Sequence, residues 1–191
     1  MPNILDLREK LKKAASIENP LKKRLWILAV ITEALHPYNV KPILIGGGAV
    51  EYYTFGGYAT FDLDMAVSDH QILTEVMDNL GLKKEGRYWS SEDLDIVIES
   101  PAGSLEGEEA PLTKVEIEDM SCYIIGLEDL IIDRLNGYVH WHWEDDRRWV
   151  MNLISLHKSE IDWDYLKKKA QQEATLKELL EIKEETEEIG D

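Results

Sequence analysis

The sequence has almost no cysteine: Cys122 is the single one among 191 residues. One thiol excludes an internal disulfide and any cysteine-rich metal site. The neighbours of Cys122, which are Ser121, Tyr123 and Ile124, are typical of a strand. We therefore expect Cys122 to be a small buried hydrophobe and not a nucleophile.

Long apolar runs are also missing. No stretch approaches the roughly 20 residues that cross a bilayer. The segment from Met1 to Lys13 is charged throughout and has no apolar signal region. We therefore expect a cytoplasmic protein without membrane contact. The hydrophobic fraction of 44% is still enough to fill the core of one domain, or of a domain with a helical annex.

Positive charge is scarce, since 21 basic residues face 38 acidic ones and leave a formal net charge of −17. Part of this excess is local, because residues 173–191 contain eight acidic residues and two lysines. Such a surface repels nucleic acid at long range, which argues against a general DNA or RNA binder. It still allows an enzyme with a local basic pocket, or an RNA substrate delivered in a specific pose.

The patterns that are present predict helices on both sides of a mixed α/β middle. Helical periodicity and end signals indicate helices over 3–15, 21–35, 49–55, 70–80, 127–138, 143–157 and 163–185. Apolar runs and alternation indicate strands over 42–45, 60–67, 84–89, 94–98 and 114–125. This order favours an α+β fold, a mixed sheet flanked by helices, over a doubly wound parallel sheet.

Three regions follow from this order. They are N-terminal helices over 1–37, an α/β core over 38–126 and a C-terminal helical region over 127–191. Within the core, the segment 100–111 is rich in Gly, Pro and Glu and is expected to be a mobile loop. The acidic end from Glu181 onward is expected to be a frayed helix or a disordered tail.

The first feature with chemical meaning is an apolar strand that ends at Ile45 and runs into Gly46, Gly47 and Gly48. Glycine lets the backbone approach a phosphate closely and donate its N–H groups to it. The glycines therefore predict a phosphate-binding turn.

The second feature is Asp62 and Asp64, which are two apart in the strand expected over 60–67. Both carboxylates then project from one face, about 6–7 Å apart along the chain. They repel each other unless a cation lies between them or one is protonated. Mg²⁺ prefers oxygen ligands and often binds together with substrate phosphates. The pair therefore predicts a magnesium site.

A third carboxylate is predicted from the apolar run 94–98, which has Asp95 embedded in it. An aspartate in such a run is costly unless it is paired or binds a metal. If this strand lies beside 60–67, Asp95 completes a cluster as a general base or a second metal ligand. Glu99, four residues further on, is the alternative.

Together these residues resemble the nucleotidyltransferase superfamily of the polymerase-beta type. The resemblance is to small prokaryotic nucleotidyltransferase-like proteins, including nucleotidyl-transferring toxins of abortive-infection systems, which share Gly-Gly-x-Ala and Thr-x-Asp-apolar-Asp stretches. It covers 43–98 well and extends more loosely to about 156. One departure is the gap of 14 residues between Gly47 and Asp62, which is slightly long for the family and includes Gly56 and Gly57.

The resemblance implies transfer of a nucleoside monophosphate from a nucleoside triphosphate such as ATP to a hydroxyl, with Mg²⁺ or Mn²⁺ as the cofactor. It implies that metal binding and catalysis belong to Asp62, Asp64 and Asp95. It implies nucleotide binding by Gly46, Gly47, Thr60 and, on a later helix, Arg134.

Arg134 is also singled out by its helix, because it falls within the apolar stripe of 127–138. Asp146 falls within the stripe of the next expected helix. Inward-facing charges need partners, so either the two pair with each other or Arg134 reaches a triphosphate. Arg147 and Arg148 are second choices for that phosphate contact.

Nearby, His140 and His142 lie on opposite faces of a helix, so a metal site there is poorly supported and the role of the segment 140–143 stays open. Two other functions also stay open: a catalytically inactive nucleotide- or partner-binding module, and the toxin of a toxin–antitoxin pair. The acceptor (RNA, protein or small molecule), a protein partner such as an antitoxin, and a homo-oligomer are not decided by these residues.

Overall fold

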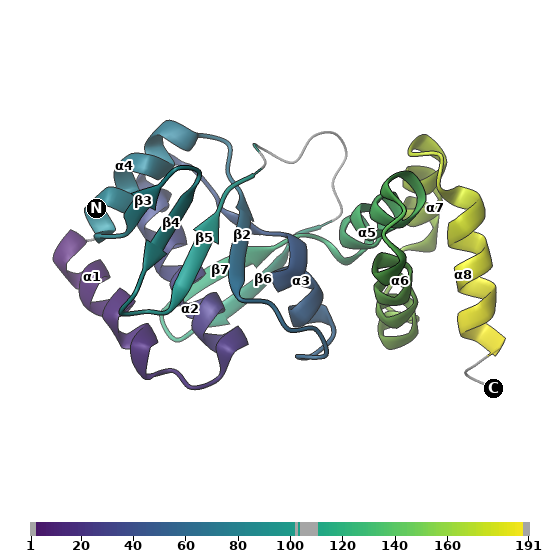
Figure 1. Cartoon of the computed structure of the whole chain (residues 1–191), viewed down its shortest axis with the longest axis horizontal. Helices are drawn as coiled ribbons and strands as arrows, with labels where there is room; N and C mark the ends of the chain where they lie inside the picture. Colours follow the sequence, from purple (N-terminus) through teal and green to yellow (C-terminus); the bar gives the residue numbers. More distant parts are fainter. Residues whose placement is uncertain (1–2, 102, 104–110, 189–191) are drawn as a thin grey trace.

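The computed structural model describes residues 3–101, 103 and 111–188 and shows an α+β fold (Figure 1). Within these residues, a seven-stranded sheet with its covering helices forms one end of the molecule, and helices α5–α8 form the other. This is the predicted fold class. Most of the predicted loop 100–111 lies outside the described residues.

The two N-terminal helices, α1 (Ile4–Lys13) and α2 (Pro20–Leu35), begin at asparagine caps. The Asn3 side chain accepts a hydrogen bond from the backbone N–H of Leu5, and Asn19 accepts one from Lys22. Pro20 suits the first helical position because that residue needs no intrahelical N–H partner. Most of α2 is buried, so it is a central element of the core.

The sheet is mixed and has the order β3-β4-β5-β2-β1-β7-β6. Central strand β2 runs antiparallel to β1 and parallel to β5, while β1 runs parallel to β7. The predicted strand 84–89 is in fact a hairpin of two strands, because residues 86 and 87 form its turn. The strands are β1 (Ile43–Leu44), β2 (Asp62–Ala66), β3 (Lys83–Glu85), β4 (Tyr88–Ser91), β5 (Ile96–Glu99), β6 (Thr113–Ile117) and β7 (Met120–Ile124).

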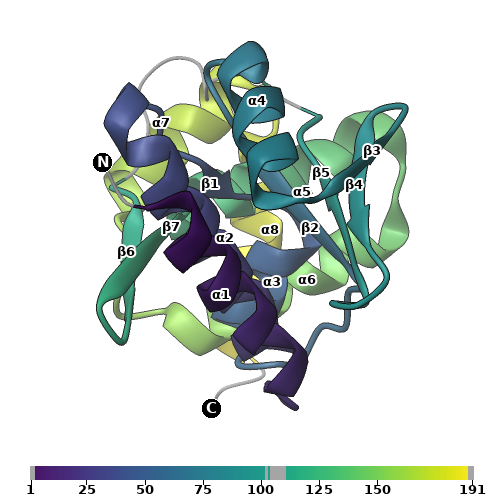
Figure 2. The same cartoon turned by 90° about the vertical axis from the view of Figure 1, so that its left-hand side faces the viewer.

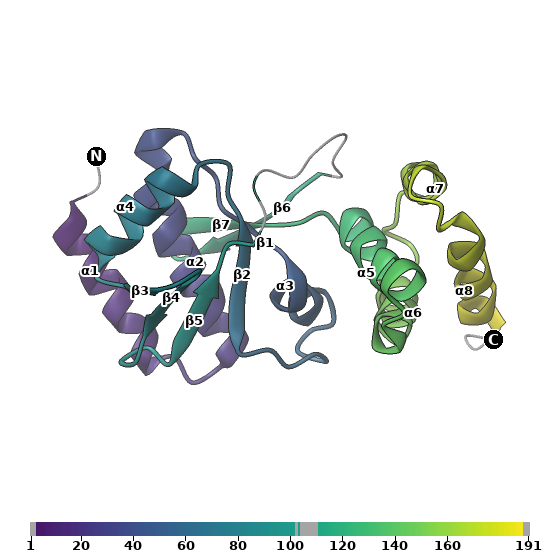
Figure 3. The same cartoon turned by 45° about the horizontal axis from the view of Figure 1, so that its top comes forward.

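Helices cover the sheet on two sides. Figure 2 shows α1, α2 and α4 (His70–Leu80) in front of the sheet and the C-terminal helices behind it. Figure 3 shows α3 (Gly46–Tyr53) between β2 and the helices α5 and α6. Helix α3 also contacts α2, where a buried ion pair joins Arg24 to Glu51. The N-terminus of α3 is thereby fixed between the sheet and the C-terminal helices.

The C-terminal region consists of α5 (Leu127–Trp141), α6 (Glu144–His157), α7 (Trp163–Gln172) and α8 (Leu176–Glu188). The prediction of a single helix over 163–185 is wrong. The chain turns at Ala174, which has a left-handed φ of 57°. The acidic end is helical through Glu188, packed against α6 and α7. None of the described helices is both long and apolar enough to cross a membrane.

Candidate active site

Asp62 and Asp64 lie on one face of β2, while Leu63 and Met65 on the other face are completely buried. Asp62 is exposed and Asp64 is half-buried. The alternation predicted from the sequence is therefore present, and on its polar face the Asp64 carboxylate lies against Gly46, the first residue of α3.

Gly46 lies directly beside the Asp64 carboxylate. A Cβ atom on Gly46 would lie 2.8 Å from Oδ2 of Asp64, and the φ of Gly46 is +61°. The strands hold this contact in place, because the backbone N–H of Ile45 donates to the carbonyl oxygen of Asp64 at 3.0 Å. Both the space and the backbone conformation therefore require glycine at this position.

The glycines form the first turn of α3, although the helix was predicted to start at residue 49. The first N–H groups of a helix have no intrahelical acceptor and carry partial positive charge. A Cβ on Gly47 would lie 2.9 Å from Cε1 of Tyr58 and 3.2 Å from Oγ1 of Thr60. Gly47 and Thr60, both predicted to bind nucleotide, are thus neighbours at the start of α3.

The structure brings Glu99, and not Asp95, next to Asp64. In the parallel pairing of β2 with β5, Asp62 is opposite Val97 and Asp64 is opposite Glu99. Directly paired residues project from the same face of a sheet. Asp95 comes before β5, in an exposed turn with a φ of +46°. The third carboxylate on this face is therefore that of Glu99, which the sequence analysis gave as the alternative to Asp95.

Asp62, Asp64 and Glu99 give the candidate site a negative charge. Burial raises the pKa of Asp64 above its ordinary value, and the neighbouring charges of Asp62 and Glu99 raise it further. The positive charge of Arg134 acts in the opposite direction. The face of β2 therefore carries an excess of negative charge that a divalent cation would compensate.

Glu99 is paired with Arg87, which the sequence did not single out. The Nε of Arg87 lies 2.9 Å from Oε1 of Glu99. The guanidinium also donates to the hydroxyl oxygen of Tyr88 at 2.6 Å and lies 4.9 Å from the centre of its ring. No sequence signal identifies Arg87, because its proximity to Glu99 depends on the pairing of β4 with β5.

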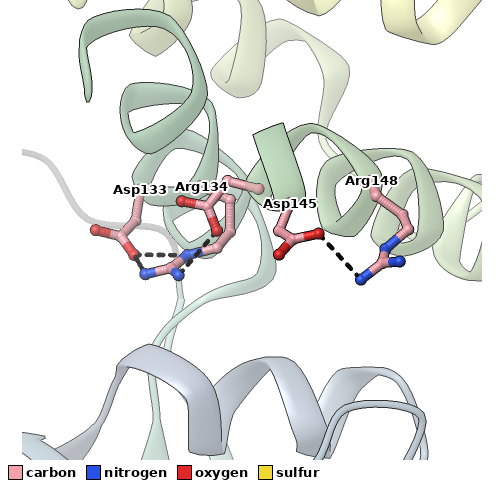
Figure 4. A network of polar contacts seen from close by, with 5 residues as sticks. Asp133, Arg134, Asp145 and Arg148 are labelled. Atoms are coloured by element: carbon pink, nitrogen blue, oxygen red, sulfur yellow. Dashed lines mark hydrogen bonds and ion pairs between the residues drawn. The ribbon is translucent and has the colours of Figure 1, made fainter. Parts of the chain in front are cut away.

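Arg134 projects from the middle of α5 and is held by two carboxylates. It donates to Asp133 beside it and, at 3.2 Å, to Oδ1 of Asp146 on α6. Figure 4 shows Arg134 with Asp133, and beside them Arg148 with Asp145. The ion pair between Arg134 and Asp146 was one of the two alternatives drawn from the sequence. Its formation leaves Arg134 close enough to act electrostatically on Asp64.

Gly137 makes room for this ion pair. A Cβ on Gly137 would lie 2.0 Å from Oδ2 of Asp146. That oxygen is buried and has no hydrogen-bond partner among the described residues. The Asp146 carboxylate therefore packs against the backbone of α5 at Gly137, one helical turn from Arg134.

An aromatic contact joins the core to α6 near the glycines. The ring centres of Tyr58 and Trp149 are 4.9 Å apart in an edge-to-face arrangement, and the Arg148 guanidinium lies 5.2 Å from the Trp149 ring. Tyr58 also contacts Gly47. The start of α3 is therefore bordered by β2 on one side and by α6 on the other.

This combination of a mixed sheet, glycines at the start of a helix and two aspartates on the next strand has a counterpart among known families. Residues 23–188 match the family described as nucleotidyltransferase of unknown function (DUF6036). The chain belongs to this family. Membership in a nucleotidyltransferase family implies a nucleotide substrate.

A solved structure supports the nucleotidyltransferase fold. An antigenic nucleotidyltransferase-like protein from Paracoccidioides brasiliensis is similar to this chain with a TM-score of 0.57 and 15% sequence identity. The similarity covers 87% of this chain and 94% of that one. At this identity, the match shows the fold alone. None of the curated proteins matches the chain.

The two aspartates of β2 do not by themselves complete a site for a metal ion. Among the described residues, no group of three or more His, Cys, Asp or Glu side chains is arranged to hold a metal. Mg²⁺, however, often binds through one or two carboxylates together with substrate phosphates. Asp62 and Asp64 would hold the ion in this way, with phosphate oxygens at the start of α3 as further ligands.

The segment 140–143 connects α5 to α6 next to the contact of Gly137 with Asp146, because the backbone N–H of Trp143 donates to the carbonyl oxygen of Gly137 at 3.1 Å. The Nε2 of His140 is 2.9 Å from the carbonyl oxygen of Glu173. The exposed rings of Trp141 and Trp143 are stacked with their centres 6.3 Å apart.

A cavity of about 710 Å³ also lies away from the carboxylates. It is formed by α2, the following turn and β7, and its lining includes Glu33, Lys41 and Tyr123. Asp62, Asp64, Glu99 and Arg134 are not among its lining residues, so we do not assign the nucleotide to it.

Proposed function

We propose that this chain is a metal-dependent nucleotidyltransferase, which transfers a nucleoside monophosphate from a nucleoside triphosphate to the hydroxyl of an acceptor. The observation that carries this proposal is the contact of Gly46 with Asp64. It puts the first helical turn of α3, suited to phosphate, next to two carboxylates suited to a cation.

In the proposed reaction, the acceptor oxygen forms a bond to the α-phosphorus. The bond from that phosphorus to the bridging oxygen breaks, and pyrophosphate leaves. Asp62 and Asp64 would hold Mg²⁺ or Mn²⁺, which would offset the charge that develops on the phosphates. Glu99 replaces Asp95 in the role of general base and accepts the proton of the acceptor hydroxyl.

The other residues hold the triphosphate. Backbone N–H groups of Gly46 and Gly47 donate to phosphate oxygens, and the hydroxyl of Thr60 next to Gly47 helps to bind the nucleotide. The guanidinium of Arg134 offsets triphosphate charge from the opposite side, with its direction set by Asp133 and Asp146. Catalysis of this type consists of positioning and electrostatic stabilisation.

The negative surface of the chain favours a small molecule or a protein side chain over a long nucleic acid as acceptor. The test is a pyrophosphate-release assay with Mg²⁺ and each of the four ribonucleoside triphosphates. Three acceptor mixtures are compared: total RNA, total protein and a small-molecule extract.

We expect release with at least one mixture, and none when EDTA is present. Nucleotide binding that is independent of Mg²⁺, without pyrophosphate in any mixture, would instead identify an inactive binding module. Dependence of the release on a purified partner protein would separate a toxin–antitoxin function from a free-standing enzyme.

A further inference from the structure

The carboxylates of β2 and β5 already have a cationic neighbour, Arg87. The Arg87 side chain is 71% exposed, whereas the Glu99 side chain that it contacts is only 16% exposed. An exposed arginine normally has many orientations, but two contacts with Tyr88 hold this one. Arg87 is therefore fixed over the third carboxylate of the candidate site.

The three acids of this face are not arranged as a ready metal site, since among the described residues no group of three or more His, Cys, Asp or Glu side chains is placed to hold a metal. Asp62 and Asp64 project from β2, and Glu99 is paired directly opposite Asp64. The Glu99 carboxylate, however, contacts the guanidinium of Arg87. A cation held by Asp62 and Asp64 would compete with Arg87 for the negative charge of Glu99.

We propose that Arg87 is a built-in counter-ion for Glu99, which competes with the divalent cation and is displaced when the metal and nucleotide bind. The inference rests on the proposed function of the Asp62 and Asp64 site. Arg87 reduces the mutual repulsion of the acids in the free protein and weakens their attraction for a cation before substrate arrives. Its release leaves the Glu99 carboxylate free to accept the proton of the acceptor.

The hairpin that contains Arg87 supplies a matched control. Lys83 has the same charge on the same β3–β4 hairpin but is paired with Glu85, at 2.6 Å. The change Lys83→Gln therefore removes one positive charge from this hairpin without touching Glu99. Arg87→Lys keeps the charge at the original position.

The test is an electron paramagnetic resonance titration of free Mn²⁺ with the full chain, without nucleotide. We expect Arg87→Gln to bind Mn²⁺ more tightly than the parent by about 1.4-fold to fivefold, the range expected for an exposed ion pair. Lys83→Gln and Arg87→Lys should match the parent. An Arg87→Gln variant that binds Mn²⁺ no more tightly than Lys83→Gln overturns the inference.

A double-mutant cycle separates a direct contact from a general charge effect. If Arg87 acts through Glu99, Arg87→Gln has no effect on Mn²⁺ affinity in a Glu99→Gln background. A gain of the same size in both backgrounds also overturns the inference.

An Asp64→Asn variant distinguishes failure of the inference about Arg87 from failure of the proposed function. If the parent binds Mn²⁺ no better than Asp64→Asn both without nucleotide and with a triphosphate that cannot be cleaved, the metal site itself is wrong and both proposals fall. If the difference appears only with that triphosphate, the role of Arg87 in the free protein falls and the proposed function stands. If Asp64→Asn alone loses binding while Arg87→Gln has no effect, only the role of Arg87 falls.

Discussion

Gly46 and Asp64 are in such close contact that no side chain fits between them. A Cβ atom on Gly46 would lie 2.8 Å from the carboxylate oxygen Oδ2 of Asp64, and the backbone of Gly46 is in the left-handed region. The two residues belong to α3 and β2, which β1 connects through its pairing with β2. The contact therefore fixes the start of a helix against an acidic strand.

Replacing Gly46 by Ala should destabilise the protein through both the backbone and the contact. Gly86 has a similar φ of +64° but open space around its Cα, so Gly86→Ala measures the backbone cost alone. We expect Gly46→Ala to lower the free energy of unfolding by about 1–3 kcal/mol more than Gly86→Ala does. Urea denaturation measures both free energies of unfolding. Equal losses of stability in the two variants would contradict a close contact between Gly46 and Asp64.

The third carboxylate can be identified by comparing Glu99 with Asp95. We expect Glu99→Gln to slow nucleotidyl transfer by about 100-fold or more, because it removes the proposed proton acceptor. Asp95→Asn should change the rate less than about twofold, because Asp95 lies in an exposed turn where asparagine tolerates the positive φ. Initial rates at saturating triphosphate test this pair. The opposite order of effects would restore Asp95 to the role predicted from the sequence.

Gly137→Ala should reverse the usual effect of this substitution in a helix. Ala is normally more favourable than Gly in a helix by about 1 kcal/mol. Here the added methyl group would lie 2.0 Å from the carboxylate of Asp146. We expect a loss of about 1–3 kcal/mol in the free energy of unfolding.

The same change should weaken triphosphate binding, since Asp146 orients Arg134. Adding Asp146→Ala to Gly137→Ala removes the overlapping group, so the two destabilisations should be less than additive. Full additivity in urea denaturation would show that the two residues do not touch.

Asp64 should make stability depend on pH in a defined direction. Burial and neighbouring acids raise its pKa in the folded state above the ordinary aspartate value of 3.8. Its contribution to stability is then fully present below about pH 3.8 and is lost as the pH rises through the higher folded pKa. In EDTA, Asp64→Asn should therefore have a higher Tm than the parent at pH 7.5.

This difference in Tm should shrink as the pH falls toward 4. Asp93→Asn, an exposed change on the turn before β5, is the control and should show no such trend. Adding Mg²⁺ should raise the Tm of the parent but not that of Asp64→Asn. A parent that is more stable than Asp64→Asn at pH 7.5 without metal would contradict the electrostatic account.

Local sequence patterns were sufficient to predict much of the fold and the shared face of Asp62 and Asp64. The 3.6-residue repeat and the Gly81 stop signal gave α4 its observed bounds, and the alternation of β2 placed Asp62 and Asp64 on one face. Cys122 is buried as expected, and burial raises the pKa of its thiol to about 12. Each of these features depends on residues close together in the sequence.

The features that the sequence did not predict depend on contacts between distant segments. In one continuous strand Asp95 and Glu99 would share a face, but β5 begins at Ile96, so Asp95 lies in the turn before it. The register of β5 against β2 then pairs Glu99 with Asp64. The pairing of Arg87 with Glu99 depends on a second register, between β4 and β5. The break between α7 and α8 occurs at Ala174, where no Gly or Pro marks it.

The most direct test of the proposed function is transfer of label from an α-³²P nucleoside triphosphate to acceptor in the presence of Mg²⁺. The parent and Asp93→Asn should label the same product at similar rates, and Asp64→Asn should label none while keeping its fold. Equal labelling by the parent and Asp64→Asn would show that the carboxylates beside Gly46 do not carry out the reaction.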